Sequence, residues 1–271
     1  MMRATMTMRT QCQRLFSPLK EIYWRAWYSY VSRADKHNEL TFMNYGFQGD
    51  EKIALRPEDE QNRYSIQLYE KTVCAIPAPL AEMTLLEVGC GRGGGISYIA
   101  GCLKPRHAIG IDICMPAIQF CERHNREQNV SFRCGDAAQL PVADNEVDAV
   151  INVESSHRYP DMPQFLREVR RVLKPGGYFA FTDFRAHDAV DALRRQFREA
   201  GFEIVEHDTI TGQVLRALEL DNQRKLDMIE RLVPRILHKP AREFASVVDS
   251  ASYRSLADGH RAYLRFLLRN P

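Results

Sequence analysis

The stretch LLEVGCGRGGG, residues 85–95, places five glycines in seven positions directly after an apolar run. Glycine accepts positive φ and carries no side chain, so a ligand can lie directly against the backbone there. The glycines fit Gly-x-Gly-x-x-Gly as well as Gly-x-Gly-x-Gly, so they are compatible with a dinucleotide and with S-adenosylmethionine. The stretch predicts the first strand-to-helix turn of an α/β sheet, at the edge where such sheets bind ligands.

Downstream of this turn, short apolar runs alternate with amphipathic helical patterns. This rhythm is typical of βαβ units and predicts a mostly parallel sheet with helices on both faces. The expected strands are residues 83–88, 107–112, 129–136, 147–154, 178–184, 202–207 and a closing strand at 262–269. Asp161 is expected to cap the helix that follows the fourth strand, and Pro175-Gly176-Gly177 to end it.

The two ends of the chain differ from this pattern. Residues 1–80 are predicted to form a helical, aromatic-rich N-terminal cap. Residues 81–271 are predicted to form the ligand-binding domain, with a mostly helical insertion at about 211–260 that is interrupted at Pro234 and Pro240. The insertion is expected to form a second wall or lid, or to make a homodimer contact.

Composition excludes several classes of protein. The net charge of +2 gives no reason to expect nucleic acid as a partner. The seven cysteines include no Cys-x-x-Cys pair, so neither a disulfide framework nor a zinc site is expected, and we predict no metal and a cytoplasmic location. No apolar run reaches the ~20 residues that span a bilayer, so no stable membrane insertion is expected. The basic first 20 residues leave a mitochondrial or membrane-peripheral location as the alternative.

Three acidic residues bear on the identity of the ligand. Asp112 ends the second expected strand and can accept hydrogen bonds from two ribose hydroxyls, which fits NAD and S-adenosylmethionine equally. Asp136 ends the third, where its carboxylate can hold an adenine amino group while the Ala137 N–H reaches a ring nitrogen. Glu87, just before the glycines, places a negative charge that suits a sulfonium and an ammonium and disfavours a pyrophosphate. Electrostatics therefore favour S-adenosylmethionine.

The sequence NVESSH follows the fourth expected strand and borders the same crevice. His157 is the candidate general base, because its ordinary pKa of about 6.5 suits proton abstraction at neutral pH. Glu154 is expected to orient His157 or to hold the cofactor, and Asn152 to line the cofactor wall. Asp183, at the end of the fifth strand, is a candidate substrate-contacting residue.

The N-terminal region is rich in aromatic residues, which predicts a cap that excludes water and receives an apolar acceptor, or simply a helix that docks on the core. Its aromatic residues include Tyr23, Trp24, Trp27, Tyr28, Tyr30, Phe42, Tyr45 and Phe47. Tyr45 is a candidate substrate contact, and Tyr69 a candidate cofactor contact.

The motifs EVGCGRG (87–93), Asp112, GDAAQLP (135–141) and LREVRRVLKPGGY (166–178) resemble, in order and spacing, those of class I S-adenosylmethionine-dependent methyltransferases. This resemblance implies a Rossmann-like, seven-stranded sheet whose last strand is antiparallel. It implies S-adenosyl-L-methionine as cofactor and S-adenosyl-L-homocysteine as product. The expected cofactor-binding residues are Glu87, Gly89, Cys90, Gly91, Gly93, Asp112, Ile113, Asp136, Ala137, Asn152 and Tyr69.

A narrower resemblance extends over most of residues 20–180. NELTFMNYGF (38–47), NRYSIQLYEKT (62–72) and NVESSHRYP (152–160) are similar to the mycobacterial phthiotriolone and phenolphthiotriolone dimycocerosate methyltransferases. It implies O-methylation of a hydroxyl or carboxyl oxygen on a small-molecule or lipid-like acceptor. The alternatives are C- or N-methylation of a small molecule, an NAD-dependent oxidoreductase, and a non-catalytic S-adenosylmethionine-binding subunit.

Overall fold

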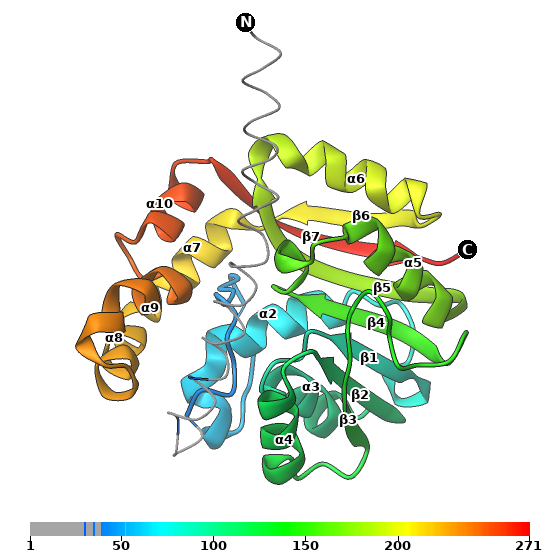
Figure 1. Ribbon diagram of the computed structural model, residues 1–271, viewed down its shortest axis with the longest axis horizontal. Helices are drawn as coiled ribbons and strands as arrows, with labels where there is room; N and C mark the ends of the chain where they lie inside the picture. The colour runs from blue at the N-terminus through cyan, green and yellow to red at the C-terminus, as the bar shows by residue number, and fades with distance from the viewer. Residues whose placement is uncertain (1–29, 31–34, 36–38, 52) are drawn as a thin grey trace, which may run out of the picture.

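A computed structural model describes residue 30, residue 35, residues 39–51 and residues 53–271. Its centre is a seven-stranded sheet of order β3-β2-β1-β4-β5-β7-β6 (Figure 1). All neighbouring strands pair in parallel except β7, which runs antiparallel to both β5 and β6. The strands are β1 (Thr84–Val88), β2 (His107–Asp112), β3 (Val130–Cys134), β4 (Val147–Val153), β5 (Leu173–Ala186), β6 (Glu203–Thr209) and β7 (Arg261–Arg269). The predicted α/β fold with a final antiparallel strand is confirmed.

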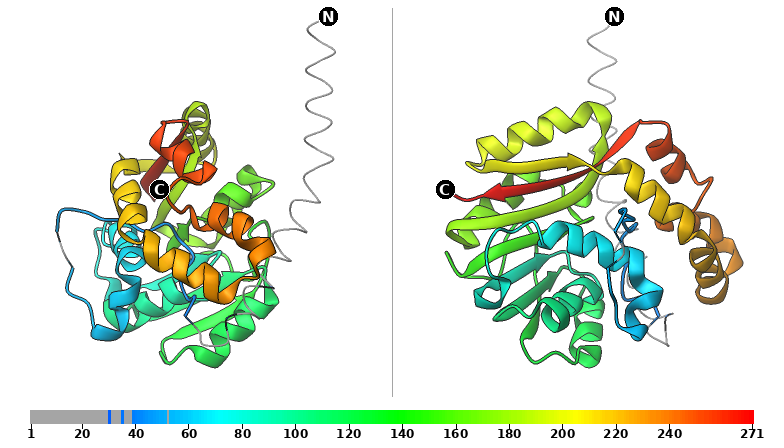
Figure 2. Two further views of the ribbon diagram at one scale, coloured as in Figure 1. Left: turned by 90° about the vertical axis from the view of Figure 1, so that its left-hand side faces the viewer. Right: turned by 180° about the vertical axis from the view of Figure 1, so that it is seen from behind.

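Helices cover both faces of this sheet (Figure 2). The helices in the described part of the chain are α2 (Arg63–Val73), α3 (Gly94–Tyr98), α4 (Met115–His124), α5 (Met162–Val172), α6 (Val190–Glu199), α7 (Thr211–Leu220), α8 (Asn222–Leu232), α9 (His238–Ala245) and α10 (Ala251–Ala257). A π-helical turn, Ile99–Leu103, continues α3. Asp161 caps α5 as predicted, with its carboxylate accepting a hydrogen bond from the Gln164 N–H.

Strand periodicity explains why the central strands are apolar on both faces. On β1, Leu86 packs with α5 and α6 on one side of the sheet, while Leu85 packs with α2 and α7 on the other. On β4, Val150 and Ile151 divide between the two sides in the same way. Successive side chains on a strand point to opposite faces, so a strand covered by helices on both sides reads as a continuous apolar run.

The boundaries differ from prediction at three places. Helix α5 ends at Val172, where the chain becomes extended, and β5 runs straight through the Pro175-Gly176-Gly177 segment that was expected to end the helix. Pro240 lies in the first turn of α9, where proline needs no hydrogen-bond partner, so it does not interrupt the insertion. The fourth strand ends at Val153, so Glu154 lies outside the sheet.

The predicted insertion is helical and is formed by α7 to α10. Helices α8 and α9 share a small apolar core of their own, built around Ile229, Ala241 and Val247, and Tyr30 and Leu40 of the N-terminal segment pack against it. Residues 39–51 run past these helices without forming a helix. Figures 1 and 2 show the insertion projecting from one end of the sheet, beside this N-terminal segment.

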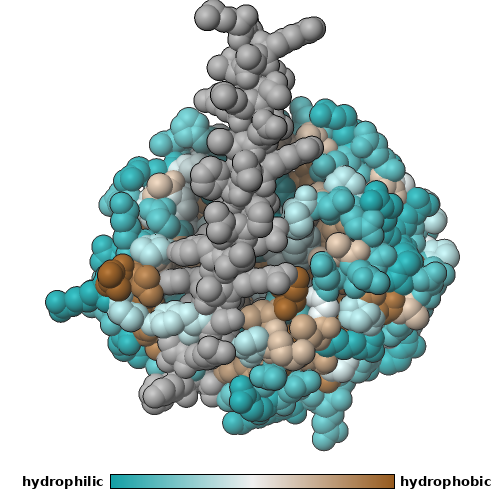
Figure 3. All heavy atoms as spheres, viewed as in Figure 1, coloured by the Kyte–Doolittle hydropathy of each residue, from teal (hydrophilic) through white to brown (hydrophobic). Residues whose placement is uncertain are grey.

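Of the predicted N-terminal helical cap, residues 1–29, 31–34, 36–38 and 52 lie outside the described residues, and with them Tyr23, Trp24, Trp27 and Tyr28. In the described part, residues 57–73 are helical, whereas residues 39–51 are not. On the face shown in Figure 3, the coloured surface is mostly hydrophilic, with hydrophobic side chains in small separate groups. No helix within the described ranges is long and apolar enough to cross a bilayer.

Candidate active site

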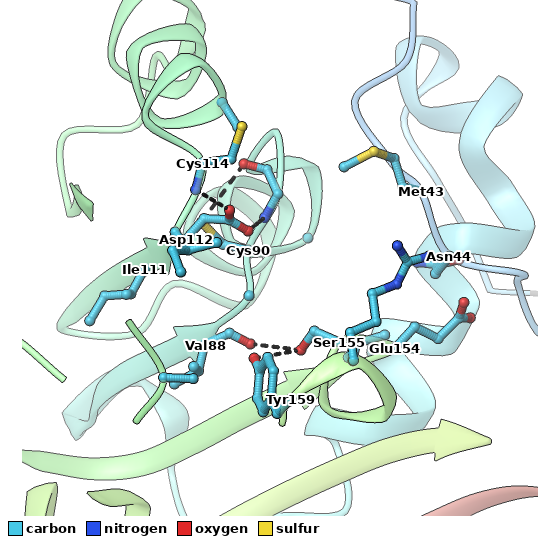
Figure 4. A pocket seen from close by; sticks show the side chains of 18 of the residues that line it. Met43, Asn44, Val88, Cys90, Ile111, Asp112, Cys114, Glu154, Ser155 and Tyr159 are labelled. Atoms are coloured by element: carbon cyan, nitrogen blue, oxygen red, sulfur yellow. Dashed lines mark hydrogen bonds between the residues drawn. The ribbon is translucent and has the colours of Figure 1, made fainter. Parts of the chain in front are cut away.

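A cavity of about 260 Å³, here called the large cavity, opens at the carboxyl ends of β1, β2 and β4. This is the edge at which open α/β sheets bind ligands. The glycine turn forms one wall, Glu154, Ser155 and residues 158–160 contribute another, and Thr41 to Asn44 close it from the N-terminal side. Figure 4 shows Asp112 and Cys114 on one side of the cavity, Met43 and Asn44 across from them, and Tyr159 below.

The glycine turn is left-handed at three alternate residues. Gly89, Gly91 and Gly93 have φ of 80°, 55° and 77°, a region of backbone conformation that residues other than glycine rarely adopt. A Cβ on Gly89 would lie 2.5 Å from the Ser155 side chain, so the turn has no space for one. Gly89, Cys90 and Gly91, all predicted cofactor-binding residues, line the cavity. Gly93, also a predicted cofactor-binding residue, does not line the cavity. It faces α4, where a Cβ on Gly93 would lie 2.8 Å from the Cys121 sulfur.

Asp112 is fixed by two backbone donors. Its Oδ2 accepts from the Gly91 N–H at 2.9 Å and its Oδ1 from the Cys114 N–H at 2.8 Å. Burial raises the pKa of this carboxyl, and the two N–H bonds oppose that rise. The carboxylate lines the cavity and keeps acceptor positions for a pair of hydroxyls.

The next part of the cavity wall comes from the ends of β2 and β3. Ile113, Asp136 and Ala137, three of the predicted cofactor-binding residues, all line it. Asp136 Oδ1 accepts from the Ala138 N–H at 2.8 Å, which fixes the turn that presents the Ala137 backbone.

Glu87 lies behind the glycine turn and is fully buried. Its Oε1 accepts a hydrogen bond from the Tyr69 hydroxyl at 2.6 Å, and Tyr69 itself lines the cavity. Its Oε2 has no hydrogen-bond partner among the described residues. Burial raises the pKa of Glu87 to about 7. A buried carboxylate with one unsatisfied oxygen, next to a cavity that holds Asp112, fits a ligand with a positive charge and ribose hydroxyls.

Polar side chains after β4 form a network that sequence reasoning only partly found. The Asn152 side-chain amide donates to the Val88 carbonyl at 2.9 Å and to Ser155 Oγ at 2.7 Å. Ser155 Oγ lies 3.0 Å from the Tyr159 hydroxyl. Ser155 and Tyr159 line the cavity, whereas Asn152 is fully buried behind them. Asn152 therefore supports the wall that it was predicted to form.

The partly buried His157 pairs with the fully buried Asp183. Asp183 is fully buried and accepts from His157 Nδ1 at 2.8 Å and from the His157 backbone N–H at 2.9 Å. Burial lowers the pKa of His157, against the opposing effect of Asp183, so the imidazole is neutral at pH 7. The His157 and Arg185 side chains hold the pKa of Asp183 far below its usual value.

Neither member of this pair lines the cavity, although both were expected at the reacting centre. His157 Nε2 accepts a hydrogen bond from Arg158 Nε at 3.0 Å, and it is Arg158 that lines the cavity. Asp183, a predicted substrate contact, lies in the interior, where it pairs with His157 and Arg185.

Glu154 lines the cavity. The sequence suggested Glu154 as a residue that orients His157, but Asp183 makes the hydrogen bond that orients this imidazole. Glu154 has a φ of 47°, a strained value for a residue other than glycine. Its Oε1 accepts from both the Tyr45 N–H and the Tyr263 hydroxyl. Burial raises the pKa of Glu154 to about 8.

A second cavity of about 80 Å³, here called the small cavity, lies beside the first. The two cavities share Phe42, Met43 and Asn44 as lining residues. The rest of the small cavity is mostly apolar and comes from α8 and α9, with Tyr45 at its edge. Tyr45, a predicted substrate contact, therefore belongs to the small cavity, where its ring stacks on Phe184 with centroids 5.4 Å apart.

A buried ion pair holds the N-terminal segment against the glycine turn. Arg92 lies 2.8 Å from Asp35, and both side chains are fully buried. Asp35 also accepts the backbone N–H groups of Glu39 and Leu40, just before the segment that closes the large cavity. Within the described ranges, no cluster of three or more His, Cys, Asp or Glu side chains could hold a metal ion.

Comparisons with known proteins agree with this geometry. A family model described as a methyltransferase domain matches residues 86–181. The chain is 38% identical over 248 residues to the fatty-acid O-methyltransferase of Mycolicibacterium smegmatis, covering 90% of this chain and 88% of that protein. It is 35% identical over 242 residues to the phthiotriol/phenolphthiotriol dimycocerosates methyltransferase of Mycobacterium tuberculosis, covering 89% of both.

Solved structures share the fold at lower identity. A putative sarcosine dimethylglycine methyltransferase from Galdieria sulphuraria matches with a TM-score of 0.68 and 15% identity, covering 84% of this chain and 93% of that one. The geranyl diphosphate C-methyltransferase of Streptomyces coelicolor A3(2), solved with S-adenosyl-L-homocysteine, matches with a TM-score of 0.66 and 19% identity, covering 90% of this chain and 98% of that one.

Gly89→Ala tests the role of the glycine turn. The positive φ and the 2.5 Å approach to Ser155 leave no space for a methyl group. We expect S-adenosylmethionine affinity, measured by calorimetry, to fall roughly 10- to 100-fold, as ~1–3 kcal/mol of backbone strain implies. Gly212→Ala is the matched control, because nothing lies within 4 Å of a Cβ at that position. Equal affinities in the two variants would contradict a role for the turn in binding.

Glu154→Gln tests the raised pKa of Glu154. Folding raises this pKa from 4.5 to about 8, so the protonated form favours the folded state, and its stabilising effect is lost as pH rises from the lower value through the higher. The Tyr45 N–H and the Tyr263 hydroxyl both donate to Oε1, an oxygen that glutamine retains. We expect equal melting temperatures for variant and wild type near about pH 5, and a variant several degrees more stable near about pH 9. A constant difference across this range would show that Glu154 is ionised throughout.

Proposed function

Because the chain belongs to the family of S-adenosylmethionine-dependent methyltransferases that includes these mycobacterial enzymes, we propose that it methylates an oxygen of a lipid-like acceptor. The observation that supports this acceptor class is the small cavity, whose lining is mostly apolar and which shares a wall with the large cavity. Ligand cavities of this kind bury apolar substrates and fix their orientation with a few polar groups. The names of the two relatives, a fatty-acid O-methyltransferase and a dimycocerosates methyltransferase, agree with it.

The large cavity is the site proposed for S-adenosyl-L-methionine, the cofactor of the enzyme. Asp112 would accept the ribose hydroxyls, while Asp136 and the Ala137 N–H would hold the adenine ring. Glu87, reached through Tyr69, would offset the positive charge. When bound, the cofactor supplies an electrophilic methyl group on a sulfonium sulfur. The protein then has to align the acceptor oxygen, hold it close and exclude water.

The residues around Glu154 are proposed to position the acceptor. Glu154 lines the large cavity, and its partner Tyr45 lines the small one, so their hydrogen bond crosses the boundary between the two. Arg158, held by His157, reaches over the Phe244 ring at 5.6 Å, and Phe244 lines the small cavity. The two cavities thus share polar groups at the place where methyl donor and acceptor would meet.

His157 has two possible roles, which depend on the acceptor. A hydroxyl acceptor needs a base to remove its proton. His157 is neutral and hydrogen-bonded to Asp183, so it could take this proton at Nε2. Arg158 would first have to break its hydrogen bond to His157 Nε2. An acceptor that is already ionised needs no base, and His157 then acts by positioning Arg158. The homodimer contact, the absence of a nucleic-acid partner, the domain division and the location in the cell remain predictions from sequence.

A label-transfer screen tests the proposed function. The purified protein would be incubated with methyl-labelled S-adenosylmethionine and with fatty acids, long-chain alcohols, phenols and amines. We expect label in a lipid ester or ether, identified by chromatography and mass spectrometry. Label only in amines, or only in macromolecules, would contradict a lipid-oxygen acceptor.

His157→Gln separates the two roles of His157. Glutamine can still donate to Asp183 and accept from Arg158, but it cannot take up a proton at neutral pH. We expect kcat to fall about 100-fold with a hydroxyl acceptor, and less than about tenfold with a carboxylate acceptor. The control is His260→Gln, because His260 is exposed and lines neither cavity. A 100-fold loss with a carboxylate acceptor would mean that His157 acts in the transfer itself.

A further inference from the structure

Lys225 is a buried cation in the small cavity. It lies on α8, its residue exposure is 9%, and it lines a cavity that is otherwise mostly apolar. Its ammonium group makes two long hydrogen bonds, at 3.4 Å to the Tyr45 carbonyl and 3.3 Å to the Ala245 carbonyl. No carboxylate of the described residues lies within ion-pair distance of it.

The charged groups around Lys225 do not neutralise it. The Asp221 carboxylate already accepts hydrogen bonds from Arg224 Nε and Nη2, each at 2.6 Å. Glu154 favours the charged lysine only at a distance, and its own raised pKa keeps it largely protonated at neutral pH. Burial lowers the pKa of Lys225 to about 8, so it still carries its charge at pH 7. A buried charge without a counter-ion is costly to a protein, and a bound anion would offset that cost.

The position of Lys225 places such an anion next to the cofactor site. The peptide backbone of Tyr45 separates the two cavities at this point. Its N–H donates to Glu154 in the large cavity, and its carbonyl accepts from Lys225 in the small one. Only the backbone of Tyr45 therefore separates the Lys225 ammonium from Glu154 in the large cavity. This is the end of the small cavity where the acceptor oxygen would have to lie.

We propose that Lys225 binds the carboxylate of the acceptor and makes this enzyme selective for long-chain carboxylic acids over the corresponding alcohols. The proposal rests on the proposed function, since it assigns the acceptor class of the same site. The alkyl chain would lie against the apolar residues of α8 and α9, among them Met228, Ile229 and Phe244.

A carboxylate acceptor also agrees with the arrangement of His157. In transfer to a carboxylate, the oxygen forms the new C–O bond while the C–S bond breaks and its electron pair stays on sulfur. No proton has to be removed, because a carboxylic acid with a pKa near about 4.5 is ionised at pH 7. The ester product is neutral and loses its attraction to Lys225, which favours its release.

Lys225→Met tests this role by binding, independently of turnover. Dissociation constants would be measured for palmitic acid and for hexadecanol with S-adenosyl-L-homocysteine present. We expect the wild type to prefer the acid, and the variant to lose about 10- to 100-fold in acid affinity while its alcohol affinity stays the same. Lys225→Gln, which keeps a donor for the two carbonyls, is the second charge-removing variant. Lys239→Met removes an exposed lysine on α9 and is the matched control. Melting temperatures establish that each variant is folded.

The possible outcomes separate this proposal from the proposed function. Acid affinity that is unchanged in both Lys225 variants, or that falls equally for acid and alcohol, would overturn the proposal. Wild-type methylation of the alcohol but not the acid would overturn it while leaving lipid O-methylation intact. If the acid binds selectively through Lys225 but no lipid is methylated, the proposed function fails and the recognition by Lys225 holds.

Discussion

The close approach of side chains to the glycine turn is the constraint on which the site depends. The backbone of residues 89–95 is contacted from several sides, by Ser155 after β4, by Met43 of the N-terminal segment and by Tyr69 of α2. A Cβ on Gly95 would lie 2.0 Å from the Tyr69 ring, so even this glycine, which needs no unusual φ, cannot be replaced without displacing α2. Three segments distant in sequence therefore converge on one turn, and the turn has space for them because five of its seven residues are glycines.

The second feature of the site is a pair of carboxyls whose ionised forms burial disfavours. Glu87 and Glu154 are both enclosed carboxyls whose pKa values burial raises, to about 7 and about 8. Each accepts a hydrogen bond from a buried tyrosine, Tyr69 or Tyr263, so these hydroxyls are fixed as donors. A cationic ligand in the large cavity would favour the ionised forms, so cofactor binding and the protonation of these residues are linked.

The sequence carried enough information for the fold and the cofactor wall, but less for the reacting centre. Strand periodicity and the glycine turn correctly place Asp112 and Asp136 at adjacent strand ends, because parallel strands bring their carboxyl ends to one edge. His157 was expected in the cavity from its position in NVESSH, yet a single 3-10 turn (Ser156–Arg158) directs His157 towards Asp183 and presents Arg158 instead. Side-chain direction within one short turn has no periodic signal that a sequence could reveal.

Lys225 was missed for a related reason, since a lone lysine in an amphipathic helix usually lies in solvent. Its burial arises from the packing of α8 against α9 and the N-terminal segment, which are remote in sequence. With the proposed acceptor, the two cavities have complementary charge, with carboxyls near the methyl donor and an ammonium near the acceptor. Methyl transfer to a carboxylate removes one positive charge from the donor and one negative charge from the acceptor. Because a site shielded from water solvates separated charges less well than bulk water does, such an enclosure favours a reaction that neutralises them. The apolar lining of the small cavity and the buried charges beside it therefore act in the same direction.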